Sequence, residues 1–170
     1  RKAQPRFMNS STGRRSRRST LLVAATVAVA AGVLTPASGP ASAAGFVVTS
    51  TANSGPGTLR DAVQSANAVV GSDTITFDLP NPSTITLTNN ITITDDLRIE
   101  GPGQSALTLT NPTTRVFDVD PGPLGTGALY VDSLTIADTG SNAIVFTSPA
   151  GDVELDDVTI ARSANHALSV

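Results

Sequence analysis

The sequence contains no cysteine and no tryptophan, and it has a single tyrosine, Tyr130. Without cysteine, disulfide bonds and thiolate metal sites are excluded, so stability has to come from apolar burial or from bound ions. Sugar-binding clefts usually carry aromatic rings on which sugars stack. The scarcity of such rings therefore argues against a sugar-cleaving cleft in this segment.

Acidic residues are missing from the first part of the chain. The first 43 residues contain seven basic residues and no acid, whereas the remainder contains four arginines and all 14 acidic residues. The remainder thus has a formal charge of −10. A surface of that sign repels phosphate backbones and anionic lipid heads, which argues against nucleic acid as a partner and favours cationic or neutral partners.

Residues 14–44 have the three-part layout of a signal peptide, with an arginine-rich start, an apolar run and a small-residue motif. The apolar run, residues 21–34, has 14 residues, whereas a membrane-spanning helix needs about 20. We therefore predict secretion or display at the cell surface, with cleavage after Ala43 or Ala44 guided by the small side chain of Ala41. The arginine pair in the basic stretch leaves both the general secretory and the twin-arginine routes open.

Residues 45–71 are expected to form a cap made of one strand and one amphipathic helix. The strand lies at residues 46–50, and Thr58 with Asp61 has the spacing of a capping box at a helix start. The helix is expected to end at Gly71. Its apolar face consists of Leu59, Val63, Ala66 and Val70.

From residue 72 to residue 170, apolar pairs with one polar residue between them recur, which is the period of a β-strand. The pairs are Ile75/Phe77, Ile85/Leu87, Ile91/Ile93, Leu97/Ile99, Leu107/Leu109, Phe117/Val119, Leu129/Val131, Leu134/Ile136, Ile144/Phe146, Val153/Leu155, Val158/Ile160 and Leu168/Val170. Short strands separated by turn residues suit a sandwich, a barrel or a solenoid.

An internal repeat favours the solenoid. Residues 128–146 align with residues 152–170 at a constant offset of 24, and every inward position stays apolar. The inward parity slips at Asp132-Ser133 and again at Asp156-Asp157, which predicts a corner at each place. Three short strands and three turns within each repeat predict one coil of a right-handed parallel β-helix with an aliphatic core. The cap would close its first coil.

The sequence stops inside a predicted strand, at residues 168–170, without a polar capping unit. We therefore expect further coils after residue 170. The predicted organisation is a signal peptide with upstream residues at 1–44, a cap at 45–71 and β-helix coils at 72–170.

Three motifs resemble the start of CSLREA-type bacterial β-helix proteins, within the pectate-lyase-like superfamily. They lie at residues 57–67, 73–77 and 97–103, with Gly57-Thr58 where the family name has Cys-Ser, and the resemblance covers most of residues 46–160. It implies an exported protein with a right-handed β-helix. It implies no catalytic residues, because the matching positions are capping and turn residues.

Asp132 and Asp156 should stack one coil apart, roughly 4.8 Å, with Asp157 beside them. Such a group of oxygen ligands is suited to calcium, but the favoured interpretation is that these carboxylates accept hydrogen bonds from turn amides. Together with Arg162 they are the one cluster with residue types suited to a hydrolase or lyase. No stacking aromatic residue flanks them, so we predict no catalytic residue, metal ligand or cofactor site in this segment.

Two other features have ordinary explanations. His166, the only histidine, aligns with Asn142 of the preceding coil, which favours a turn role. Outward Thr-x-Thr motifs resemble the files of ice-binding solenoids, but threonine is common on solvent-facing strands and their spacing is irregular. These motifs are Thr74-x-Thr76, Thr84-x-Thr86-x-Thr88, Thr92-x-Thr94 and Thr108-x-Thr110.

The sequence favours a structural or adhesive surface protein that meets an extracellular protein or polysaccharide, with no membrane span in the mature chain. The alternative is the N-terminal part of a polysaccharide lyase or glycoside hydrolase, with its active coils beyond Val170.

Overall fold

The fold was analysed in a computed structural model, which describes residues 42–121, 127–147 and 152–169. All of these residues belong to one unit, Ala37–Val170. The predicted signal peptide, apart from its last three residues, and Val170 lie outside the described residues.

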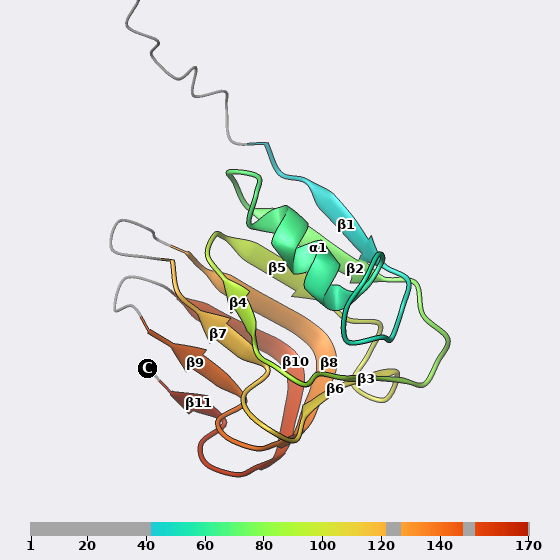
Figure 1. Cartoon of the computed structure of the whole chain (residues 1–170), viewed down its shortest axis with the longest axis vertical. Coiled ribbons are helices and arrows are strands. Elements are labelled where there is room, and N and C mark those ends of the chain that lie inside the picture. Colours follow the sequence, from blue (N-terminus) through green and yellow to red (C-terminus); the bar gives the residue numbers. More distant parts are fainter. Residues whose placement is uncertain (1–41, 122–126, 148–151, 170) are drawn as a thin grey trace, which may run out of the picture. The chain divides into compact units, whose positions relative to one another are not determined.

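The strands form a parallel β-helix, which confirms the predicted fold class. Every strand pair is parallel, and the strands fall on three faces because the chain turns after each short strand. The first face holds β1 (Gly45–Val48), β2 (Asp73–Phe77), β5 (Leu97–Glu100) and the first halves of β8 (Leu129–Thr139) and β10 (Val153–Ser163). The second holds β3 (Ser83–Thr86), β6 (Leu107–Asn111) and the second halves of β8 and β10. The third holds β4 (Ile91–Ile93), β7 (Phe117–Val119), β9 (Ile144–Phe146) and β11 (Leu168–Ser169). Figure 1 shows these strands stacked as successive rungs.

The repeat found in the sequence sets the register of many strand pairs. Val153 pairs with Leu129, and the same offset joins β2 to β5 and β3 to β6 in the early coils. Leu97 of β5 pairs instead with Leu129 of β8, which lies further along the chain than one repeat, because the connections after β5 and after β7 are both longer than their equivalents in the repeat. This insertion of residues between β5 and β8 hides the early register in the sequence.

The predicted corners are confirmed, and each long strand has a second one. Ser133 and Asp157, one repeat apart, adopt positive φ angles of 54° and 48°. Asp138 and Arg162 repeat this conformation at φ 51° and 52°. At the first corner the backbone packs tightly, since a Cβ on Gly101 would clash with the carbonyl oxygen of Ser133. A side chain at position 101 would therefore displace the neighbouring coil.

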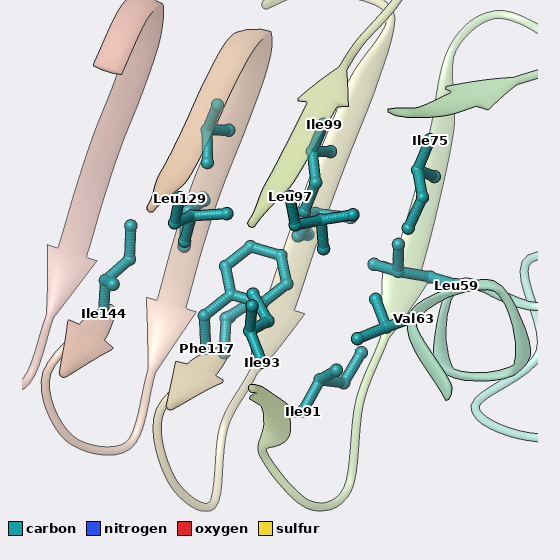
Figure 2. Close-up of a cluster of buried hydrophobic side chains, with 14 of the residues drawn as sticks. Leu59, Val63, Ile75, Ile91, Ile93, Leu97, Ile99, Phe117, Leu129 and Ile144 are labelled. Carbon is teal, nitrogen blue, oxygen red and sulfur yellow. The ribbon is translucent and has the colours of Figure 1, made fainter. Parts of the chain in front are cut away.

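Inward-facing aliphatic side chains fill the interior. Ile75, Ile99 and Val131, which lie on successive rungs of one face, are fully buried. Figure 2 shows such side chains from neighbouring strands in one continuous cluster, with Phe117 near its centre. Stacking places like side chains about 4.8 Å apart, so each one contacts its equivalents in the coils before and after it.

The helix α1 (Leu59–Ala66) covers the interior of the first coil, as predicted. Leu59 and Val63 are fully buried and point toward the strand side chains (Figure 2). Thr58 caps the helix and its hydroxyl accepts a hydrogen bond from the amide of Asp61. The Asp61 carboxylate accepts from the amide of Gly57, one residue before the position of a standard capping box.

The predicted end of the helix is wrong. The helix stops at Ala66, and Val70 is 76% exposed, so Val70 is not part of the buried face and Gly71 does not end the helix. Asn67 directly follows the helix, and its side chain donates to the carbonyl of Thr92 and accepts from the amide of Thr94. These two bonds join the helix end to the strand β4 and to the residue after it, while the amides of Ala68 and Val69 bond to carbonyls three residues back in tighter turns.

A second side chain holds the helix against the first coil. The Arg60 guanidinium donates to the carbonyl oxygens of Asn53, Asn89 and Asn90, at 3.2, 2.7 and 2.9 Å. Arg60 and Asn67 are both residues of the motif at 57–67. The structure thus gives that motif a role in docking the cap. Within the described part of the chain, no helix is long and apolar enough to cross a membrane.

Side chains of the last described coil are less buried. Leu155 and Leu168 are 37% and 39% exposed, although their partners Val131 and Ile144 one coil earlier are fully buried. The inward direction is therefore as predicted, but no described residue covers this face of the coil.

Candidate functional site

The best-organised polar surface lies on the outside of the first face, where β5, β8 and β10 run side by side. Because Leu97, Ile99, Leu129 and Val131 point inward, the residues between them point outward. Arg98 pairs in register with Tyr130, and Tyr130 with Glu154. We call this surface the Tyr130 face, and define it as Arg98, Glu100, Tyr130, Asp132, Glu154 and Asp156.

An arginine stacked on the tyrosine ring forms the centre of the Tyr130 face. The guanidinium carbon of Arg98 lies 3.8 Å from the ring centroid of Tyr130, a cation–π contact. Arg98 also forms an ion pair with Glu100 at 2.5 Å and a longer one with Asp132 at 3.9 Å. The arginine therefore contacts an aromatic face and two carboxylates at once, which holds it in one orientation.

Local electrostatics follow from this packing. The hydrogen bond to Glu100 raises the pKa of Arg98 above its usual value, so the guanidinium keeps its charge. Desolvation raises the pKa of Tyr130, and the neighbouring Arg98 charge partly opposes that change. The phenol is therefore a neutral hydrogen-bonding group at physiological pH.

The structure brings Asp132 and Asp156 together, as predicted, and places Asp157 beside them. Asp132 and Asp156 are register partners on β8 and β10. Asp132 accepts from the hydroxyl of Ser133, and Asp157 accepts from the side chain of Gln104. Asp156 accepts a long hydrogen bond, 3.4 Å, from the phenol of Tyr130. Among the described residues, no three acidic or histidine side chains form a group that could hold a metal ion.

Arg162 does not join these acids. It forms a two-point ion pair with Asp138, in which both nitrogen–oxygen contacts are 2.7 Å or shorter. The hydrogen bonds from Arg162 lower the pKa of Asp138. The pair links the second corners of two successive coils. The cluster of acids and Arg162 considered for a lyase or hydrolase is thus divided between two places.

His166 lies in a turn, where its backbone pairs with the coil before it. Its amide donates to the side-chain oxygen of Asn142 at 3.2 Å, and its carbonyl accepts from the amide of Ala143. The predicted alignment of His166 with Asn142 therefore corresponds to a real contact between coils.

Although the Thr-x-Thr motifs are irregularly spaced in the sequence, four threonines stack in one regular row along the β-helix. Thr84, Thr108, Thr135 and Thr159 are register partners on the outside of the second face. Gln104 covers part of this file, because its backbone carbonyl accepts from the Thr135 hydroxyl and its side-chain oxygen accepts from that of Thr159. The covered half cannot present a flat threonine lattice, which supports the ordinary interpretation.

Sequence reasoning missed the stacking of Arg98 on Tyr130 and the role of Gln104. The insertion between β5 and β8 is the reason for the first omission, since the repeat pointed only to partners at its own shorter offset. Gln104 lies in a loop without a repeat partner, and nothing in the sequence marks its bonds to Asp157 and Thr159, far along the chain.

Comparison with known proteins finds no matching family model, no matching curated protein and no matching solved structure. The fold and the arrangement of the Tyr130 face therefore rest on the geometry described above.

Proposed function

We propose that this protein is an exported structural scaffold of the CSLREA-type β-helix group, and that the Tyr130 face binds an extracellular polysaccharide or protein. The observation that carries the proposal is the oriented Arg98–Tyr130 stack, framed by carboxylates on a hydrogen-bonded sheet. Tyrosine and arginine dominate recognition surfaces because they combine contact area with directional hydrogen bonds. A rigid sheet adds little ordering cost when a partner binds.

The charge of the chain restricts the chemistry of the partner. Residues 44–170 carry four arginines against 14 acids, so the surface repels polyanions at long range. On the Tyr130 face, Glu100, Asp132, Glu154 and Asp156 offer acceptors around one ring. Hydroxyl-rich neutral sugars and basic peptides are the ligands that such acceptors and one aromatic ring suit.

Two carboxylates at the corners of the long strands, one predicted and one not, are engaged within the fold. Asp138 pairs with Arg162, while Asp157 receives hydrogen bonds from Gln104 and Ser133. These contacts support a scaffold role for the corner residues, because a carboxylate fixed in a turn is not free to act as acid or base.

Binding of the full chain to immobilised neutral polysaccharides and to basic peptides tests the proposal. We expect Tyr130→Ala and Arg98→Ala each to weaken binding at least about tenfold, since truncating a hot-spot residue costs about 2 kcal/mol or more and about 1.4 kcal/mol corresponds to tenfold. Thr84→Ala is the matched control, because Thr84 is an exposed outward strand residue on another face.

Equal binding by all three variants would contradict the proposed role of the Tyr130 face. Release of unsaturated or reducing-end fragments from the polysaccharide would contradict the scaffold role and favour a lyase or hydrolase. Export is tested separately by fractionating cells that express the full chain, and retention of the intact chain in the cytoplasm would contradict it.

A further inference from the structure

Asp73 is a wholly buried acidic residue at the first position of β2, and no described residue forms an ion pair with it. One carboxylate oxygen, Oδ1, accepts a hydrogen bond from the backbone amide of Ala44 at 2.7 Å. The other oxygen, Oδ2, is buried and has no hydrogen-bond partner among the described residues. A buried carboxylate with one neutral donor is costly, since buried charges are normally paired with an opposite charge.

The donor to Asp73 lies at the predicted cleavage site. Ala44 N–H binds the carboxylate, and Ala44 C=O accepts from the amide of Thr74 at 2.8 Å, which is the first contact of the β1–β2 ladder. Ser42 and Ala43, just before it, are exposed. Ala44 is thus the first described residue that the fold holds, and it follows Ala43, one of the two predicted cleavage positions.

We propose that cleavage between Ala43 and Ala44 creates an α-ammonium group on Ala44 that forms a buried ion pair with Asp73, so that removal of the signal peptide completes the fold. The inference rests on the export proposed above. A signal peptidase would add water across the Ala43–Ala44 peptide bond, leaving a carboxylate on Ala43 and an amine on Ala44 that takes up a proton. The ammonium has three N–H donors where the uncut chain has one, which is enough to serve both oxygens of Asp73.

The same geometry decides between the two predicted cleavage positions. A cut after Ala44 would remove the only donor to Asp73 among the described residues, as well as the first ladder bond. A cut after Ala43 keeps both contacts and adds a charge of the required sign. Ala43 and Ala41 then occupy the two positions where a signal peptidase needs small side chains.

Asp96 offers a matched control within the same fold. Its Oδ1 accepts from the backbone amide of Ala128 at 2.8 Å, as Asp73 accepts from that of Ala44. Asp96 is partly exposed, and Ala128 lies far from any cleavage site. Substitution of Asp96 should therefore have the same effect before and after cleavage.

The composition of the chain makes the new amine easy to follow. Lys2 is the only lysine of this sequence, so after cleavage the α-amine of Ala44 is the only primary amine in residues 44–170. In the full chain, residues 40–43 are replaced by Ile-Glu-Gly-Arg, and a site-specific protease then exposes Ala44. The same preparation provides the uncut and the cut protein.

An amine-selective acylating reagent at neutral pH then measures the pairing. Acylation consumes only the neutral amine, so an ion pair that raises the amine pKa by one unit slows labelling about tenfold. We expect labelling at least about tenfold slower in the native cut protein than in its Asp73→Asn variant, with Asp96→Asn as slow as the parent. Cutting should also raise the melting temperature by at least about 4 °C in the parent and not in Asp73→Asn.

Equal labelling rates in the parent and in Asp73→Asn would overturn the ion pair. If Asp73→Asn fails to fold, the parent in buffer is compared with the parent in urea, where equal rates would likewise overturn it. The mass of the exported natural chain tests the processing step: a chain starting at Ala44 supports it, and any other start overturns it. Failure of labelling alone leaves export standing, whereas retention of the uncut chain in the cytoplasm overturns export and processing together.

Discussion

Replacement of one isoleucine in two successive coils tests how stacking creates stability. Ile136 and Ile160 are register partners on β8 and β10, and both point inward. Ile136 is fully buried and lies between Leu109 and Ile160 in the stack. Ile160 has Ile136 on one side and is only partly buried. The two positions thus share residue type, strand position and direction, and differ in whether a coil covers them.

Ile136→Ala should lower the free energy of unfolding by about 3–4 kcal/mol, because the lost transfer energy is joined by an enclosed cavity. Ile160→Ala should cost about 1 kcal/mol, since part of its side chain already meets water and the gap is open to solvent. Urea unfolding is followed by the fluorescence of Tyr130, which is unambiguous because the chain has no other tyrosine and no tryptophan. Equal costs at the two positions would refute the reasoning from stacked coils.

Three further outcomes are expected. Arg162→Ala should raise the pKa of Asp138 toward its ordinary value in a carboxyl NMR titration, and an unchanged titration would contradict the pairing. Because folding lowers that pKa, the small stabilisation from Asp138 is present above about pH 4 and is lost as the pH falls through the lowered value. Asn111→Ala should destabilise the fold by about 2 kcal/mol in urea, since this buried side chain satisfies turn groups in four hydrogen bonds. Calcium should leave the melting temperature unchanged, because among the described residues no three acidic or histidine side chains form a group that could hold the ion; a saturable rise would restore the calcium hypothesis.

The sequence predicts the coils well where two successive repeats have equal length. The match of residues 128–146 to 152–170 corresponds to real register pairs, and the parity slip at Ser133 and Asp157 marks residues with positive φ. Period-two patterning works here because burial selects one side of each strand. It does not reveal which coils neighbour one another across an insertion, which is why the pairing of Arg98 with Tyr130 was not predicted.

The cap shows a second limit of prediction from sequence, which concerns the end of the helix. Helical spacing predicted a face that ran to Val70, but the helix stops at Ala66, and the Asn67 side chain bonds instead to the backbone of Thr92 and Thr94. Periodicity indicates which side of a helix is apolar, but it does not fix the residue at which the helix ends. Asp73 illustrates the same gap, since the first polar residue of a predicted strand gives no sign of complete burial.

Methyl–methyl nuclear Overhauser contacts between Ile136 and Ile160 would test the central claim, that successive coils stack in parallel at the offset of the internal repeat. The register requires a strong contact between these two side chains, because their Cα atoms are partners on adjacent rungs. Its absence, or backbone contacts that show β8 and β10 running in opposite directions, would contradict the parallel β-helix and the surfaces built on it.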